Sequence, residues 1–281
     1  MEKVSEIVSV FRDTFFVGKF TNTERLVNRM IHTNSLTKKY DNGFVAVNDL
    51  NIQVQKGDIY GYLGPNGAGK TTTIRMLNGL LQPTRGEVLI GNRKVADHLV
   101  EIRKMIGVLP ESHGYYNWMS GREYLTLFAK LYGYDKSKLK NRVDEVLTWV
   151  GMIEKAHIPI GQYSRGMKQR IGLAKTIIHE PELIFLDEPT LGLDPQGQKD
   201  IQNIILQLNK EKGVTVFITS HLLKDISEIC NRVAIVSQGN LIEENSLVGL
   251  LEKYKSLSET GEVTLEDIFF YLTQSKEVKS Q

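Results

Sequence analysis

Residues 64–71 have the sequence GPNGAGKT, and the patterns on either side of them decide the fold. The apolar segment 58–63 (DIYGYL) precedes them with the character of a strand, and helical spacing begins at residue 71 (TTTIRML). Glycines let backbone N–H groups turn inward around an anion, while Lys70 reaches the outer phosphates and the Thr71 hydroxyl binds Mg²⁺. A strand, a glycine-rich loop and a helix in this order predict a P-loop within an α/β fold. The residues predicted to bind the nucleotide here are Gly64, Pro65, Asn66, Gly67, Ala68, Gly69, Lys70, Thr71 and Thr72.

Two later strands end in polar side chains that complete a nucleotide-hydrolysing site. The apolar segment ELIFLDEP (182–189) places Asp187 where a carboxylate binds Mg²⁺, and the adjacent Glu188 can orient or deprotonate an attacking water. His221 follows the strand pattern VTVFITS (214–220), at the strand end where ligands gather in open α/β sheets. Its imidazole can donate to the γ-phosphate and hold the water together with Glu188. The predicted catalytic residues are therefore Glu188, His221 and Lys70.

The segment YSRGMKQR (163–170) is a second candidate anion site. Small residues stand beside cationic ones just before a run with helical spacing, so free backbone N–H groups are expected at a helix start. The predicted nucleotide contacts in this segment are Ser164, Arg165, Gly166 and Met167. One bound nucleotide does not need two such cradles, and the separation between the two segments needs a physical explanation.

The P-loop, YSRGMKQR, LIFLDEPTLGLDP (183–195) and TSH (219–221), in this order and at these separations, resemble the ATP-binding cassette (ABC) ATPases. The resemblance covers residues 31–240 and implies ATP and Mg²⁺ as cofactors, with ATP hydrolysis coupled to transmembrane transport. The signature YSRGMKQR and the ending TLEDIF (264–269) are similar to those of the branch that contains drug-extrusion and sodium-extrusion ATPases, whose membrane subunits are separate chains.

The resemblance also implies further site residues. Tyr40 matches the aromatic residue that stacks on adenine, although Phe44 is close enough in sequence to compete for that role. Glu111 occupies the position of a glutamine that senses Mg²⁺ and contacts the transport subunit, so Glu111 joins Thr71 and Asp187 as a predicted metal residue. Asp194 matches an aspartate in the loop that links the two sites of a dimer.

Two positions depart from the family pattern. A carboxylate at Glu111 can accept a hydrogen bond from a metal-bound water but cannot donate one as an amide does, so its coupling chemistry differs. In the signature, Arg165 stands where a glycine is usual and Met167 where glutamine is usual. We expect the Arg165 charge either to lie near a partner's phosphates or to face solvent.

The pattern along the chain predicts a P-loop NTPase core in which helices cover both faces of a mixed sheet. The core includes an N-terminal antiparallel β part and an inserted helical subdomain over about 113–162. Ser120 with Glu123 forms a capping box at the start of the insertion, and Thr264 can cap a last helix against Asp267. A helix is expected over 71–81, a helical extension over 241–273 and a disordered tail over 274–281.

Residues 1–30 stand apart as an N-terminal extension. Apolar residues at Val4, Ile7, Val8, Phe11 and Phe15 fall on one helical face, but the next apolar residues blur the pattern. A helix packed on a partner, a membrane-surface helix and a segment outside the native domain all remain open. Translation from Met30 is a further alternative, because this residue immediately precedes the first predicted strand.

Bulk composition narrows the function classes. Lys and Arg total 35 against 33 Asp and Glu, and the basic residues are scattered, which argues against nucleic-acid binding. The single cysteine, Cys230, has apolar neighbours and is expected to be a buried thiol in a reducing cytosol. Apolar runs are of strand length, so any span of a membrane belongs to another chain. The resemblance implies a location at the cytoplasmic face of the cell membrane, through a separate polytopic permease.

A dimer explains the second anion site. Helices of the insertion would carry YSRGMKQR away from the strand ends that hold the P-loop, so this segment needs a nucleotide bound to another subunit. A two-fold dimer, of identical or of related subunits, provides that nucleotide twice. The predicted function is therefore the ATPase subunit of an exporter, with a soluble ABC ATPase of cofactor assembly, translation or DNA repair as the alternative.

Overall fold

The computed structural model describes residues 28–112, 114–258 and 262–277 of the chain. Its centre is a six-stranded sheet with the order β11-β10-β4-β9-β8-β7, in which β11 alone is antiparallel to its neighbour. The strands are β4 (Ile59–Leu63), β7 (Ile106–Leu109), β8 (Leu183–Asp187), β9 (Thr215–Ser220), β10 (Arg232–Ser237) and β11 (Asn240–Ser246). Every residue of β4, β8 and β9 is buried, as expected for parallel strands covered on both faces.

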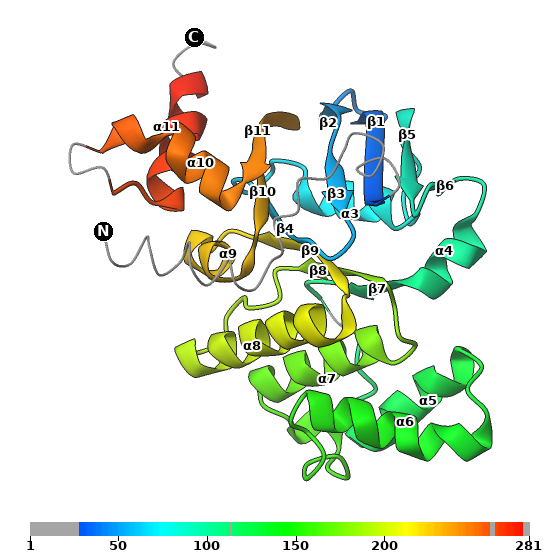
Figure 1. The fold of residues 1–281 in the computed structure, drawn as a ribbon. Helices are drawn as coiled ribbons and strands as arrows, with labels where there is room; N and C mark the ends of the chain where they lie inside the picture. The colour runs from blue at the N-terminus through cyan, green and yellow to red at the C-terminus, as the bar shows by residue number, and fades with distance from the viewer. Residues whose placement is uncertain (1–27, 113, 259–261, 278–281) are drawn as a thin grey trace.

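A smaller antiparallel sheet, built from strands in the N-terminal part of the chain, packs beside this core (Figure 1). Its strands have the order β2-β1-β5-β6, and β3 also pairs with β1. Their bounds are β1 (Arg29–Lys39), β2 (Val45–Leu50), β3 (Gln53–Gln55), β5 (Arg85–Ile90) and β6 (Arg93–Lys94). The mixed sheet and the antiparallel part confirm the fold predicted from the sequence.

Helices cover both faces of the six-stranded sheet, and α5 and α6 lie at the end of the molecule away from the antiparallel sheet (Figure 1). The helices are α3 (Lys70–Leu77), α4 (Leu99–Met105), α5 (Gly121–Leu131), α6 (Lys136–Trp149), η1 (Ile160–Gln162), α7 (Arg165–Ile177), α8 (Pro195–Lys212), α9 (Leu223–Ile229), α10 (Leu247–Lys253), η2 (Lys255–Leu257) and α11 (Leu265–Glu277). Helices α5, α6 and α7 pack on one another, and α7 also packs on β7, so α7 joins the helical subdomain to the core.

The predicted helix starts are confirmed where the sequence supplied a cap. The Ser120 hydroxyl accepts a hydrogen bond from the Glu123 backbone N–H, and the Glu123 carboxylate accepts one from the Ser120 backbone N–H. Thr264 and Asp267 exchange the equivalent bonds before α11. Each pair satisfies N–H groups that a helix start leaves free, which fixes where these helices begin.

Two buried clusters form the core, one on each face of the six-stranded sheet. One contains the inner faces of α5 to α9 and of the C-terminal helices α10 and α11, and the other joins the sheet to α3 and the antiparallel strands. Cys230 is buried in the first cluster, as predicted, and burial raises the pKa of its thiol. Within the described residues, no helix combines the length and apolar composition needed to cross a bilayer.

Four boundaries differ from the sequence expectations or go beyond them. Residues 241–246, at the start of the predicted helical extension, belong to strand β11 because they pair with β10. Helix α3 ends at Leu77, four residues before the predicted 81, because the chain turns at Gly79 with φ 72°. Strand β1 begins at Arg29, inside the predicted extension, of which residues 1–27 lie outside the described part. Helix α11 continues to Glu277, inside the predicted tail, and residues 278–281 lie outside the described part.

Candidate functional site

The P-loop lies between the end of β4 and the start of α3, as the sequence predicts. Gly69 is the residue before α3 and has φ 95°, in the left-handed region that favours glycine. A Cβ atom at Gly69 would lie 2.2 Å from the Ala46 carbonyl oxygen. No side chain caps the first turn of α3, so its backbone N–H groups are available to an anion.

Lys70 begins α3 and its ammonium group lies within the loop. Its Nζ donates to the carbonyl oxygens of Gly64 (2.8 Å) and Pro65 (3.3 Å), and it lies 3.9 Å from the Glu188 carboxylate. The Lys70 side chain is almost fully buried. Because these contacts already hold the ammonium group inside the loop, it can exchange them for hydrogen bonds to phosphate oxygens without first moving into bulk water.

Asp187 ends β8 and Glu188 follows it directly, and the two carboxylates are held in different ways. The Asp187 carboxylate accepts a 2.6 Å hydrogen bond from the Thr219 hydroxyl on the neighbouring strand β9. Glu188 has a left-handed backbone with φ 52°, and its carboxylate contacts His221 rather than Thr219. Its backbone N–H donates to the Thr219 carbonyl oxygen at 3.1 Å, so Thr219 positions both acids.

His221 and Glu188 form a pair at the ends of their strands. The Glu188 carboxylate oxygen lies 2.8 Å from His221 Nδ1 and accepts a 3.2 Å hydrogen bond from the His221 backbone N–H. The Glu188 side chain is only 9% exposed, whereas that of His221 is 42% exposed. The pair therefore fixes the carboxylate in place and leaves the imidazole accessible to a ligand.

These groups surround one cavity of about 460 Å³. Its lining includes the predicted residues Asn66, Gly67, Ala68, Gly69, Lys70, Thr71, Thr72, Glu111, Asp187, Glu188 and His221. Ala46 and Leu191 also line it, and nothing in the sequence pattern identified them. Of the two candidate aromatic residues, Phe44 lines the cavity and is 55% exposed, whereas the Tyr40 hydroxyl lies 3.4 Å from the Thr72 hydroxyl at its margin.

The donor set at the predicted metal position consists of oxygen atoms. Thr71, Glu111 and Asp187 offer one hydroxyl and two carboxylates to the same cavity. Mg²⁺ prefers oxygen ligands and binds through one or two carboxylates together with substrate phosphates, so these residues fit that ion. Among the described residues, no group of three or more His, Cys, Asp or Glu side chains is arranged to hold a metal.

The signature segment lies at the start of α7, apart from the P-loop cavity. The Ser164 hydroxyl accepts a 3.3 Å hydrogen bond from the Met167 backbone N–H and so caps the helix. Ser164, Gly166 and Met167 do not line the P-loop cavity. The structure thus brings the first group of predicted residues together and leaves this second group separate.

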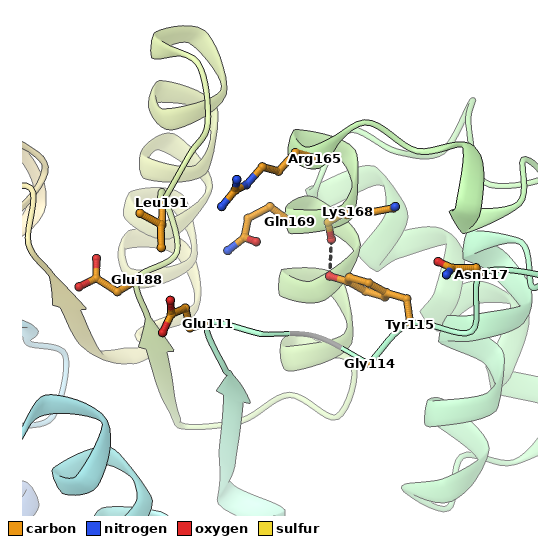
Figure 2. Close-up of a pocket in the computed structure, with 9 residues that line it drawn as sticks. All are labelled: Glu111, Gly114, Tyr115, Asn117, Arg165, Lys168, Gln169, Glu188 and Leu191. Atoms are coloured by element: carbon orange, nitrogen blue, oxygen red, sulfur yellow. Dashed lines mark hydrogen bonds between the residues drawn. The ribbon is translucent and has the colours of Figure 1, made fainter.

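A second cavity, of about 440 Å³, lies between the P-loop site and α7 (Figure 2). Glu111, Glu188 and Leu191 line both cavities. The other wall of the second cavity includes Arg165, Lys168, Gln169 and Tyr115. Figure 2 shows Arg165 extending from α7 toward the segment that carries Leu191.

Comparisons with known proteins agree with this site. A profile of the ABC transporter family matches residues 47–191, which include the P-loop, the signature and the β8 carboxylates. The bacitracin transport ATP-binding protein BcrA of Bacillus licheniformis is 45% identical over 218 residues, which cover 78% of this chain and 70% of BcrA.

The chain belongs to the ABC transporter family.

It is the ATP-binding subunit of an ABC transporter and an ATPase, as the resemblance implied. The linearmycin resistance ATP-binding protein LnrL of Bacillus subtilis is 36% identical and covers 76% of this chain and 68% of LnrL. Among solved structures, the ATP-binding cassette MJ0796, dimeric and bound to ADP and phosphate, matches with a TM-score of 0.71 and 26% identity, over 77% of this chain and 98% of MJ0796. CbiO1 of Clostridium perfringens, part of the transporter complex CbiONQ, matches with a TM-score of 0.74 and 25% identity, over 82% of this chain and 93% of CbiO1.

Proposed function

We propose that this ATPase works as a dimer at the cytoplasmic face of the cell membrane and drives export through a separate polytopic membrane protein. The observation that supports a dimer is that the two anion-binding helix starts of one subunit, at α3 and at α7, do not share a cavity. In a two-fold dimer the signature of one subunit meets the nucleotide of the other. The dimeric MJ0796 structure supports this arrangement.

Within each site, the chain's own residues bind and orient the nucleotide. The P-loop N–H groups and Lys70 hold the phosphates, and Phe44 or Tyr40 stacks on the base. Thr71 and Asp187, with Glu111 nearby, would hold Mg²⁺, which would supply positive charge against that of the phosphates. Glu188 accepts a proton from the attacking water.

His221 supports the water and the transferred phosphate from the end of the neighbouring strand, β9. Its ring is held against Glu188 at 2.8 Å and remains exposed to the cavity, so the same imidazole can face Glu188 and donate to a phosphate oxygen. Because a carboxylate only accepts, Nδ1 is the donor in the contact with Glu188, and donation from Nε2 to a phosphate oxygen requires a proton on both ring nitrogens. The two side chains are proposed to act as one unit.

ATP stabilises the closed dimer because it adds contacts from the partner's Ser164 and Gly166. Hydrolysis and phosphate release remove these contacts and favour opening, since a ligand shifts an equilibrium only by its differential affinity for the two states. The opening and closing would drive the membrane protein through the region around Glu111. Either a second copy of this chain or a related chain completes the dimer.

Export rather than import is supported by the relatives, whose names describe bacitracin transport and linearmycin resistance. The names of these relatives and the transporter family match favour a transport role over cofactor assembly, translation or DNA repair. We propose an antibiotic-like compound as cargo, recognised mainly by the membrane subunit.

The test is recovery of the membrane partner. Tagged Glu188→Gln protein is purified with ATP from detergent-solubilised membranes, and a Glu188→Gln, Ser164→Arg double variant serves as the matched control. We expect a polytopic membrane protein to be recovered with the first variant in ATP and in lower yield with the control. Recovery of only soluble partners would contradict the proposal.

A further inference from the structure

The loop of residues 188–194, here called the catalytic loop, carries Glu188 at its first position. Its backbone there is left-handed, a conformation that persists in a non-glycine residue only when surrounding contacts fix it. Three anchors come from the core of the molecule. The Glu188 N–H donates to Thr219, the Thr190 hydroxyl donates to Asp225 at 2.5 Å, and Asp194 caps α8 by accepting from the Gly197 N–H.

A fourth anchor comes from the helical subdomain. A Cβ placed on Gly192 would lie 2.4 Å from Arg165 Cζ and 2.4 and 2.6 Å from its two terminal nitrogens. These nearly equal distances mean that the face of the guanidinium, rather than its edge, packs on the Gly192 Cα. Gly192 has φ 68° and no side chain, and both properties are needed for this approach. Figure 2 shows the Arg165 side chain pointing at this loop.

The contact is a packing contact and not an ion pair. Within the described residues, the Arg165 guanidinium forms neither a hydrogen bond nor a salt bridge. It lines the same cavity as Leu191 and Glu188, both of which belong to the catalytic loop. A planar guanidinium packs flat on a backbone in a way that a lysine ammonium cannot reproduce.

We propose that Arg165 is a positioning residue. It fixes the position of the catalytic loop of its own subunit relative to α7, and through this loop the position of the Glu188 carboxylate. The proposal rests on the role assigned to Glu188 in the proposed function. The backbone of the signature remains available to the partner's nucleotide, while the Arg165 side chain acts within its own subunit. A displacement of α7 relative to β8 is thus transmitted to the catalytic loop through the contact between Arg165 and Gly192.

Substitutions at Arg165 separate packing from charge. Arg165→Lys keeps the positive charge and Arg165→Gln removes it, and neither can pack flat as the guanidinium does. We expect both variants to lower kcat about tenfold, with KM for ATP changed less than about twofold, because a misplaced catalytic group costs rate without altering the P-loop. Activity retained by the lysine variant and lost by the glutamine variant would assign Arg165 to phosphate binding and overturn the proposal.

Gly192→Ala tests the same contact from the other side, with Gly213→Ala as its matched control. Gly213 has φ 66°, close to that of Gly192, but a Cβ there meets nothing within 4 Å. We expect kcat to fall about tenfold in Gly192→Ala and by less than about twofold in Gly213→Ala.

The double variant Arg165→Gln, Gly192→Ala completes a cycle. If the two residues act through one contact, kcat of the double variant should be less than about threefold below kcat of Arg165→Gln. If they act independently, the two falls in kcat should multiply. Melting temperatures identify any variant that fails to fold. ATP-driven dimerisation is measured in parallel on Glu188→Gln protein. If this protein does not dimerise with ATP, the proposed dimer is contradicted, whereas the role of Arg165 is still decided by the kcat values of the cycle.

Discussion

Glu188→Gln is the substitution whose effect the geometry defines best. Glutamine keeps the volume of the side chain, and its amide oxygen can still accept the 3.2 Å hydrogen bond from the His221 backbone. Lys70 loses the carboxylate at 3.9 Å but keeps its bonds to Gly64 and Pro65, so no buried charge is left without partners. Folding and ATP binding should therefore change little.

The rate of hydrolysis should change greatly, because an amide cannot accept the water proton. Loss of general base catalysis typically costs about 10²- to 10⁴-fold, which corresponds to about 3–5 kcal/mol of activation free energy. Steady-state phosphate release measures kcat, and a fluorescent ATP analogue measures binding in the same preparations. Glu182→Gln is the matched control, since the Glu182 side chain is 52% exposed and, within the described part of the chain, forms an ion pair only with Lys56, at 3.6 Å.

Turnover by Glu188→Gln within about threefold of the unsubstituted protein would refute the base role. A loss of ATP affinity as large as the loss of kcat would also contradict the base role, because the substitution would then act on ATP binding rather than on the transition state. Retained binding with a large fall in kcat is the result that the structure predicts.

Three further substitutions test the P-loop, the acid sensitivity and the core. Gly69→Ala should abolish ATP binding measured by fluorescence, because the new methyl group would lie 2.2 Å from the Ala46 oxygen and φ is 95°. Burial lowers the pKa of His179 below its ordinary value of 6.5, so the folded protein favours the neutral imidazole. The contribution of this imidazole to the free energy of unfolding is therefore complete above that pH and is lost as the pH falls below it. Accordingly, His179→Gln should make the melting temperature less sensitive to acid between about pH 7 and pH 5, and an unchanged slope would contradict this. Leu125→Ala on α5, fully buried, should cost about 2–5 kcal/mol in urea unfolding, against less than about 0.5 kcal/mol for Leu131→Ala, which is 71% exposed on the same helix. Equal costs at the two positions would show that the subdomain core is not as described.

The sequence predicts the catalytic half of the site well because its chemistry depends on local order. A P-loop needs its glycines and Lys70 within one turn, so spacing alone indicates the cradle. Asp187, Glu188 and His221 follow apolar strands, and parallel strands bring their carboxyl ends to one edge. The partner of Asp187, Thr219, was missed, although its position two residues before His221 at the end of the same strand was a usable signal.

Features that depend on packing between distant segments were beyond the sequence. Leu191 lines both cavities only because of the turn that Glu188 begins, and no periodic pattern marks it. Arg165 is exposed, in line with the expectation that it faces solvent, but its packing on Gly192 of its own subunit was not predicted. Side-chain direction at a helix start follows from the neighbouring loop, and that loop is known only once the fold is known.

The central claim is that the signature of one subunit completes the nucleotide site of another, and ATP-dependent dimerisation tests it most directly. The measurement is the mass in solution of Glu188→Gln protein with ATP and with ADP, with and without Ser164→Arg. We expect a dimer with ATP that Ser164→Arg abolishes while the isolated subunit still binds ATP. A dimer that persists in the Ser164→Arg variant, or a monomer that loses ATP binding with this substitution, would contradict it.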